Sequence, residues 1–343
     1  MIETKGQCPY CFGALDKKGA CENCGKKLKP SGVPAKHLPP FTLLKNRYRV
    51  GVAIGEGGFG ITYRGWDELN GYAVAIKEYF PSAMITREGN RLTCKTDDVR
   101  QKFILGKKRF ASEAKNMAVI KNVKGVTAVL DFFSENDTVY IVMEYLDGVT
   151  LDKYLSAVGK LSFERAFSLL RPILEAVRSL HKAGFIHADI SPDNIMIMTN
   201  GDSKLIDFGS ASHVGVFEGR RQVTLKKHFA PPEQYNSGMV LCAETDVYAI
   251  GATFYYAVTL TRPPESVKRE ARDDLRLPGS MGAKITADEE RALLTALKLR
   301  AEERFGTIDE LINAFSTASG NCSKFKEKEI KPSLLKKLFG MKK

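Results

Sequence analysis

Runs of hydrophobic residues broken by single polar positions dominate the first half of the chain. Residues 48–54 and 60–66 read as two strands joined by the turn GEGGFG, and residues 72–78 read as a third strand. Residues 140–145 (YIVMEY) are apolar at most positions and read as a buried strand. Runs of this length and composition, bounded by glycine, are typical of sheet strands.

Helical spacing dominates the second half. Residues 163–182 carry an apolar stripe that faces a core, and Pro172 in its middle is expected to kink or break the helix. Residues 107–120 read as a helix that places Phe110, Met117 and Ile120 on a shared face. The nearly uncharged run 247–260 is too short to span a bilayer and suits a buried helix. Residues 80–106 are expected to form an extended connection, and residues 262–285 loops and short helices.

The composition is that of an ordinary globular protein. The 343 residues are 43% hydrophobic and 27% charged, enough for one large domain or two modest ones with small appendages. The first residues are polar and show no signal-peptide pattern. We therefore expect a cytoplasmic protein.

The formal charge of +12 is unevenly distributed. Residues 1–47 carry +6 and residues 319–343 carry another +6, whereas residues 48–318 are neutral. Because the basic surplus lies on the flanks, the central part is not marked as a nucleic-acid binder.

Four of the seven cysteines are clustered near the start, as Cys8-Pro-Tyr-Cys11 and Cys21-Glu-Asn-Cys24. Two C-x-x-C pairs at this spacing can place four thiolates around one structural Zn²⁺, and we predict a zinc ribbon over residues 1–29. The alternative, a pair of disulfides, needs an oxidising compartment that nothing here indicates. Residues 30–47, with several prolines and lysines, read as an extended linker that is not packed.

Five residues follow the glycine-rich turn in the order and spacing that phosphoryl transfer from ATP requires. They are Lys77 in VAIK, Glu113, Asp189 and Asn194 in HADISPDN, and Asp207 in D-F-G. Aspartate or glycine at any one position is weak evidence, because aspartates cap turns and glycines mark many of them. The combination in this order is highly specific.

With these motifs, residues 48–316 resemble a protein kinase of the eukaryotic type. The segments GEGGFGITY, VAIKEYFP and APPEQY are similar to those of bacterial serine/threonine kinases. The resemblance implies a two-lobed α+β fold, with an antiparallel sheet and one helix in the first lobe and a mainly helical second lobe. It also implies ATP, Mg²⁺ or Mn²⁺, and protein substrates.

The resemblance assigns nucleotide contacts in the first lobe. Lys77 is expected to pair with the α- and β-phosphates and with Glu113. Met143 is the expected gatekeeper beside the adenine, and the backbone from Glu144 to Leu146 the expected hinge. The remaining expected nucleotide contacts, by resemblance, are Ile54, Gly55, Gly57, Gly60, Thr62 and Ala75.

In the second lobe the resemblance assigns the chemistry. Asp189 is expected to accept or orient the proton of the acceptor hydroxyl, and Asn194 and Asp207 to bind Mg²⁺. Glu233 of APPE and Arg304 are expected to form a structural ion pair. Asp246 is expected to support the backbone of the catalytic loop.

Two positions depart from the family pattern. Ala188 stands where an arginine usually pairs with an activation-loop phosphate, so we expect activity that does not need such phosphorylation. Ser191 stands where a lysine usually contacts the γ-phosphate, and Lys226 occupies a position that is usually threonine. We therefore hypothesise that Lys226 supplies the missing charge; the alternative is a solvated loop lysine beside Lys227.

Residues 317–343 read as a basic tail in which Leu334, Leu335, Leu338 and Phe339 could share one helix face. Such a segment could lie on the anionic inner face of a membrane or bind a partner, or it could be a disordered solubilising tail. The zinc ribbon could also bind a partner protein.

The function indicated is transfer of phosphate from ATP to Ser/Thr of proteins; the alternatives are a kinase-fold enzyme for a small molecule and a non-catalytic scaffold.

Overall fold

The structure is a computed structural model that describes residues 6–27, 33–119, 123–207, 212–213, 225–236, 238–320 and 338. The chain divides into two compact units. The N-terminal unit comprises Met1–Lys121 and Ala128–Leu146, and the C-terminal unit comprises Asn122–Thr127 and Asp147–Lys343.

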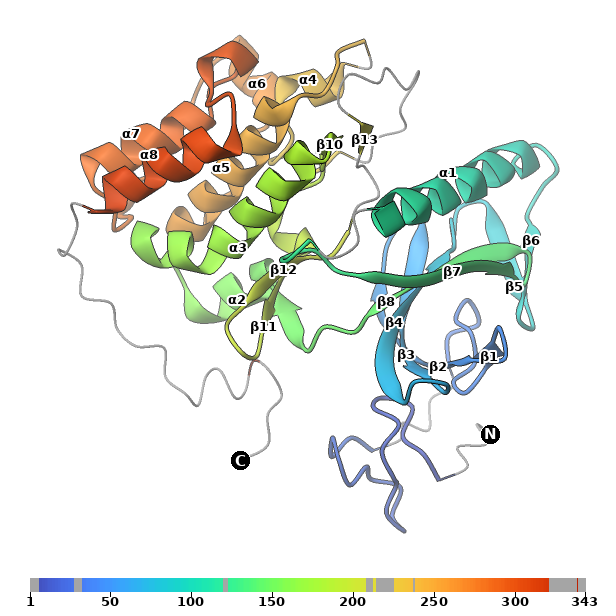
Figure 1. Cartoon of the computed structure of the whole chain (residues 1–343). Helices are drawn as coiled ribbons and strands as arrows, with labels where there is room; N and C mark the ends of the chain where they lie inside the picture. The colour runs from blue at the N-terminus through green and yellow to red at the C-terminus, as the bar shows by residue number, and fades with distance from the viewer. Residues whose placement is uncertain are drawn as a thin grey trace. The chain divides into compact units, whose positions relative to one another are not determined.

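The N-terminal unit is built on one antiparallel sheet of six strands, in the order β1-β2-β3-β4-β8-β7 (Figure 1). Along the sheet these strands are β1 Leu43–Leu44, β2 Tyr48–Glu56, β3 Gly60–Asp67, β4 Tyr72–Tyr79, β8 Thr138–Glu144 and β7 Val129–Glu135. Along β3 every second residue is buried, which is the alternation of a strand with one face in the core. Gly65 lies on that face, where an added Cβ would come within 2.5 Å of the side chain of Ile76.

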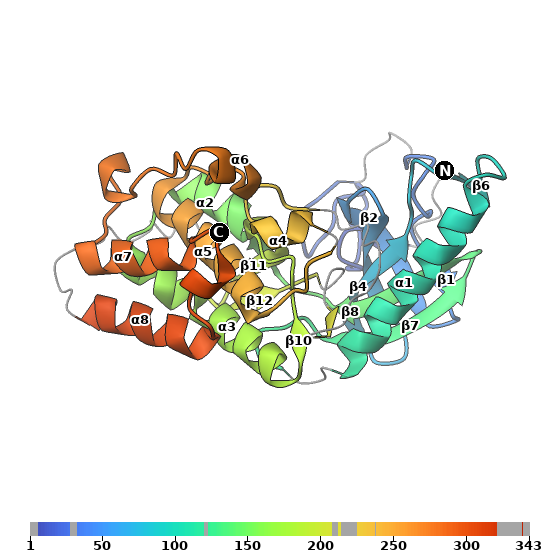
Figure 2. The ribbon, with the colours of Figure 1, turned by 90° about the horizontal axis from the view of Figure 1, so that it is seen from above.

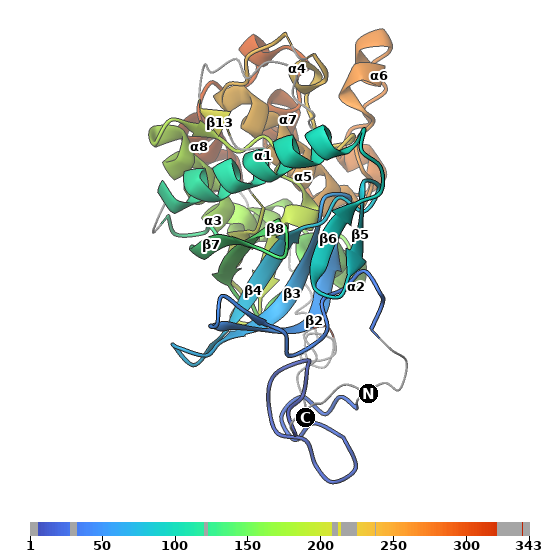
Figure 3. The same ribbon diagram turned by 90° about the vertical axis from the view of Figure 1, so that its right-hand side faces the viewer.

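One helix crosses this sheet, α1 Arg100–Val119, which packs against β7 and β8 (Figure 3). It begins at Arg100, about two turns before the predicted residue 107. Phe103 in this added part is buried and stacks on Tyr79. The connection before it contains a hairpin, β5 Ile85–Glu88 and β6 Arg91–Cys94, where the sequence predicted only an extended segment.

Residues 38–44 differ from the unpacked linker that the sequence predicted. Leu38 and Leu44 are buried in the same core as the sheet. The backbone of this segment bonds to β2: Phe41 N–H donates to Val50 O at 2.6 Å and Val50 N–H donates to Thr42 O at 2.8 Å. The segment turns at Pro40 and Phe41, where Phe41 has a φ of 71°, and two leucines anchor it to the sheet, so the predicted extended and unpacked linker is wrong here.

The C-terminal unit is mainly helical. Its core is formed by α3 Phe163–Lys182, α5 Ala243–Thr259, α7 Ala287–Ala296 and α8 Ile308–Gly320, which pack side by side (Figure 2). Phe163, Phe254 and Phe315 meet at their centre with ring centroids 4.9–5.9 Å apart. Helix α5 is buried from Thr245 to Thr259, as its uncharged sequence predicted. Helix α3 runs without interruption through Pro172, so no break occurs there.

Shorter elements complete this unit. A three-stranded sheet has the order β12-β11-β9, and a two-stranded sheet pairs β10 with β13. Residues 262–285 contain short helices and loops, as predicted. The remaining elements are β9 Gly148–Thr150, α2 Leu151–Val158, β10 Phe185–Ile186, η1 Pro192–Asn194, β11 Ile195–Met198, β12 Ser203–Leu205, β13 Ser212–His213, α4 Pro232–Tyr235, α6 Ser266–Ala271, η2 Gly279–Met281 and η3 Ala301–Glu303.

Among the described residues, none of the helices combines the length and the apolar character needed to cross a bilayer. The predicted tail helix lies outside the described residues, apart from Leu338.

Candidate active site and metal cluster

The catalytic loop lies between β10 and β11 and brings the predicted Asp189 and Asn194 together. The Asn194 side-chain amide donates to the Asp189 carboxylate at 2.7 Å and to the Asp189 backbone carbonyl at 2.9 Å. The N–H of Ile206, next to Asp207, donates to the Asn194 carbonyl at 3.0 Å. With its nitrogen engaged by Asp189, Asn194 presents its amide oxygen as the atom that can ligate a metal. The donor set, an amide oxygen and a carboxylate, fits a hard cation such as Mg²⁺.

Asp246 on α5 holds the backbone of this loop, as predicted. Its carboxylate is fully buried and accepts hydrogen bonds from the N–H groups of His187 and Ala188, both at 2.8 Å. His181 Nε2 lies 2.8 Å from the same carboxylate. Burial opposes ionisation, but His181 and the His187 N–H hold the pKa of Asp246 below its usual value.

The backbone of Ala188 is strained. Its φ of 59° lies in the left-handed region, which costs about 1–2 kcal/mol for a residue with a Cβ. Two contacts hold it there: the bond from its N–H to Asp246, and a bond from the Gln234 side chain to its carbonyl at 2.7 Å. Gln234 belongs to APPEQY, so this element is tied directly to the catalytic loop.

Lys226 lies beside the catalytic loop. Its Nζ is 3.6 Å from the carboxylate of Asp193, and its backbone carbonyl accepts from the N–H groups of Phe229 and Ala230. Lys227, by contrast, is exposed. Ser191 is fully buried, and its hydroxyl has no hydrogen-bond partner in the part of the chain that the structure describes. The role of Lys226 stays a prediction.

Glu233 and Arg304 form the buried ion pair that the sequence predicted. Two guanidinium nitrogens of Arg304 lie 2.7 and 3.1 Å from the two carboxylate oxygens of Glu233. The other bonds of Arg304 go to the backbone carbonyls of Lys298, Leu299 and Glu244. The pair connects α4 to the segment around η3 and is structural.

In the N-terminal unit the strand register places several predicted nucleotide contacts on one face of the sheet. Lys77 is directly opposite Thr62, and Ala75 is directly opposite Met143. Because Lys77 and Ala75 are two residues apart on β4, all four side chains share a face. Lys77 Nζ lies 5.6 Å from the centre of the Phe110 ring on α1. Glu113 is also on α1, but its side chain lies outside the described part, so the Lys77–Glu113 pair stays a prediction.

The glycine-rich turn, residues 55–60, is closed by a bond from Gly57 N–H to Gly60 O at 2.9 Å. A Cβ on Gly57 or Gly58 would meet nothing within 4 Å, so phosphate oxygens can approach the backbone there. A Cβ on Gly60 would lie 2.7 Å from the carbonyl of Glu78, so this glycine is required by the sheet itself. Ile54 is exposed. The Glu144 carboxylate accepts a bond from Ala128 N–H at 2.9 Å, and the role of the backbone from Glu144 to Leu146 as the hinge stays a prediction.

A buried polar network beside Lys77 was not predicted. Glu78 is fully buried and pairs with Arg87 at 2.5 Å, while the hydroxyls of Tyr140 and Tyr63 donate to it at 2.9 and 3.0 Å. Burial raises the pKa of Glu78 against the attraction of Arg87. The signal in the sequence was a glutamate inside an apolar strand, which must have a partner.

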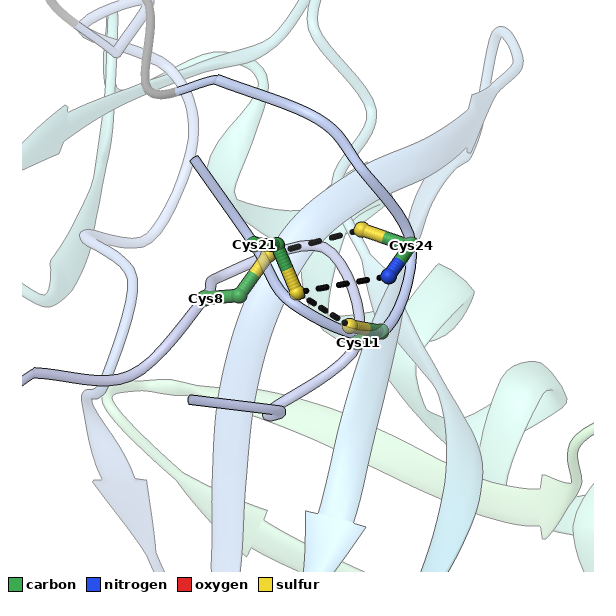
Figure 4. Close-up of side chains that lie close together, drawn as sticks. All are labelled: Cys8, Cys11, Cys21 and Cys24. Atoms are coloured by element: carbon green, nitrogen blue, oxygen red, sulfur yellow. Dashed lines mark hydrogen bonds between the residues drawn. The ribbon is translucent and has the colours of Figure 1, made fainter. Parts of the chain in front are cut away.

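The four clustered cysteines converge on one point (Figure 4). Their sulfur atoms all lie within 4.8 Å of one another, with Cys11 and Cys21 at 3.3 Å and Cys8 and Cys24 at 3.7 Å. A disulfide needs about 2.05 Å, whereas a tetrahedral zinc–thiolate site with bonds of about 2.3 Å separates its sulfurs by about 3.8 Å. The donor set therefore fits a closed four-thiolate metal site.

Comparison with known proteins agrees with this geometry. The family model described as protein kinase domain matches residues 48–296. A probable serine/threonine-protein kinase of Clostridium acetobutylicum is 29% identical over 288 residues, which are 82% of this chain and 41% of the relative. Serine/threonine-protein kinase PknB of Mycobacterium tuberculosis is 30% identical over 284 residues, 78% of this chain and 42% of PknB. The chain thus spans about two fifths of the length of these relatives.

Among solved structures, the one named PpkA-294 apo form superposes with a TM-score of 0.72 at 31% identity, over 82% of this chain and 99% of that one. The fold is the two-lobed α+β kinase fold that the motifs predicted. Members of this family use ATP with a divalent cation such as Mg²⁺. From the matched residues, the shared motifs and the fold, the chain belongs to the protein kinase domain family.

Proposed function

We propose that this chain is a serine/threonine protein kinase that transfers the γ-phosphoryl group of Mg-ATP to hydroxyl groups of proteins in bacterial signalling. The observation that carries the proposal is the catalytic loop, in which Asp189 and Asn194 are hydrogen-bonded and their backbone is held by the buried Asp246.

The residues divide the work. Asp189 would orient the acceptor hydroxyl and take its proton as the new oxygen–phosphorus bond forms and the bond between the γ-phosphorus and the bridging oxygen of ADP breaks. Asn194 and Asp207 would hold Mg²⁺, which when bound neutralises charge on the β- and γ-phosphates. Lys77, oriented by Glu113, would hold the α- and β-phosphates, with backbone amides from Gly55, Gly57 and Gly60. The adenine would contact Ile54, Thr62, Ala75 and Met143, and bond to the backbone of Glu144–Leu146.

Lys226 would supply the positive charge that Ser191 lacks. Its Nζ lies beside the catalytic loop, and its backbone is fixed by two hydrogen bonds to its carbonyl. A cation close to the transferring phosphoryl group stabilises charge as it develops.

The remaining parts of the chain have supporting roles in this proposal. Residues 1–29 form a ribbon with structural Zn²⁺ on Cys8, Cys11, Cys21 and Cys24, which leaves no open position for catalysis and offers a surface to a partner protein. The kinase domain covers residues 48–316 and acts in the cytoplasm. The basic tail, 317–343, would bring it to the anionic inner face of the membrane.

Intact-mass spectrometry tests the reaction. The wild-type chain and an Asp189→Asn variant are each incubated with Mg-ATP and a generic protein acceptor such as casein. We expect mass increases of one phosphate or more with the wild type only, on Ser or Thr. If the wild-type chain binds ATP but adds phosphate neither to itself nor to the acceptor, the proposal is rejected in favour of a small-molecule kinase or a scaffold.

A further inference from the structure

The ribbon contacts β2, the strand that leads into the glycine-rich turn. On its outer side β2 pairs with β1 at Tyr48 and Arg49, and Val50 bonds to the backbone of Phe41 and Thr42. Beyond that point the N–H of Val52 donates at 3.0 Å to the carbonyl of Pro9, which lies inside the first cysteine pair. The register between β2 and β3 shifts between Val50 and Ala53, as at a β-bulge, which re-aims the local backbone.

Side chains extend this contact. Phe12, next to Cys11, lies with its ring centre 6.0 Å from that of Trp66 on β3 and 6.4 Å from that of Phe41. Gly51 lies beneath it: an added Cβ would come within 2.6 Å of the Pro9 carbonyl and 3.1 Å of the Phe12 ring. The ribbon and the strand therefore meet at backbone distance, with an aromatic cluster around the contact.

The segment that follows the ribbon is fixed to the sheet as well. The N–H of Leu38 donates to the Tyr63 hydroxyl at 3.1 Å, and Arg87 donates to the carbonyl of Lys36 at 2.8 Å. The His37 ring packs edge-on against the ring of Tyr63. These contacts join Lys36, His37 and Leu38 to the buried Glu78 network described above.

Lys36 and His37 close on the glycine-rich turn itself. Each contacts one carboxylate oxygen of Glu56, the residue between Gly55 and Gly57. The bond from Lys36 lowers the pKa of Glu56. Without these partners a carboxylate would stand free beside the backbone that receives phosphate, where its negative charge opposes ATP.

We infer that the metal ribbon and residues 36–38 form a built-in brace for the nucleotide site, in which Lys36 and His37 clasp Glu56 and the docked ribbon holds β2. The brace keeps the glycine-rich turn in place and keeps the Glu56 charge away from phosphate. Undocking the ribbon or opening the clasp weakens nucleotide binding. The inference rests on the proposed use of ATP, and it makes the ribbon a regulator of nucleotide affinity.

Two variants of the full chain open the brace at different points. Lys36→Ala/His37→Ala removes both partners of Glu56. Phe12→Ala removes the aromatic contact of the ribbon but keeps all four cysteines, and the zinc content of the purified protein shows whether the ribbon is still folded. The matched control is Glu68→Ala. Glu68, directly after β3, pairs with Arg49 on β2, and its side chain is 38% exposed against 39% for Glu56.

Two readouts are needed. The first is the Kd of a fluorescent ATP analogue with Mg²⁺, and the second is hydrogen exchange of the amides at 55–60, which needs no nucleotide. We expect each brace variant to raise the Kd about threefold, which is about 0.7 kcal/mol, and to speed exchange at the turn. We expect no change for Glu68→Ala.

An unchanged Kd in the double variant overturns the clasp, and an unchanged Kd in Phe12→Ala with full zinc content overturns the role of the ribbon. A wild-type chain that does not bind Mg-ATP would instead reject the proposed function. In that event hydrogen exchange of the amides at 55–60 still tests the brace by itself. Equal exchange rates in the wild type and in both brace variants would reject it.

Discussion

The catalytic loop and the glycine-rich turn are both held by a carboxylate, but in opposite surroundings. Asp246, which holds the loop, is fully buried and ordered by two backbone N–H groups and His181. Glu56, in the turn, is 39% exposed and is held by two side chains from the segment before the domain. Removing one partner of a buried charge costs about 3–5 kcal/mol, whereas an exposed pair is worth about 0–1 kcal/mol. The loop of the C-terminal unit is thus held by a support that is costly to remove, whereas the turn of the N-terminal unit is held by contacts that are easier to break.

The largest effect is expected at the buried pair that fixes APPEQY to the C-terminal unit. Arg304→Ala removes the guanidinium that pairs with the buried Glu233 carboxylate and should lower the free energy of unfolding by about 3–5 kcal/mol. Urea denaturation followed by far-UV circular dichroism measures this change.

Arg291→Ala is the control for that measurement. Arg291 pairs with Asp288 on α7, where both side chains are more than half exposed, and its loss should cost less than about 1 kcal/mol. Equal losses of unfolding free energy in the two variants would contradict the expectation that the buried ion pair stabilises the fold more than the exposed one.

A smaller but catalytic effect is expected at Lys226. Lys226→Ala should lower kcat by about 10²-fold with little change in KM for ATP, because the lost contact acts on charge that develops in the transition state. Steady-state kinetics with a peptide acceptor measures both constants.

Lys227→Ala, at the exposed neighbour, is the matched control and should leave kcat within about twofold. If both lysines give the same kcat on removal, Lys226 is a loop lysine and not a catalytic one.

The smallest effect is expected from the hydroxyl groups of the activation segment. Replacing Ser210, Ser212 and Thr224 together by Ala should leave turnover within about twofold of wild type. Ala188 carries no guanidinium to bind a loop phosphate, and Gln234 already holds the Ala188 carbonyl. A large loss of turnover in the triple variant, relative to wild type, would show that activity requires phosphorylation of these hydroxyl groups.

Much of the fold and of the second-lobe site could be predicted from sequence, because the spacing of motifs follows from local geometry. HADISPDN spans one loop and one short helix, so Asp189 and Asn194 must lie close together, and they do. Glu233 and Arg304 are 71 positions apart and could be paired only through the family resemblance.

What the sequence did not predict depends on partners distant in the chain. Glu78 pairs with Arg87, which lies in a hairpin that the sequence pattern did not predict. Leu38, within a proline-rich segment, donates its N–H to the Tyr63 hydroxyl. A single leucine among prolines carries no periodicity, so its burial could not be inferred. The Glu56 clasp joins residues on either side of the expected domain boundary, where a division into domains leads one to expect no contact.

Gly51 gives a sequence criterion for whether a related chain can hold its ribbon on the sheet. Any side chain at this position would occupy the space taken by the Pro9 carbonyl, so even alanine should exclude the docked ribbon. Among kinase-domain chains that carry two C-x-x-C pairs upstream, those with glycine three residues after the start of the strand that corresponds to β2 are expected to hold the ribbon on the sheet. Those with valine or isoleucine there should carry it as a separate module, free to evolve other attachments.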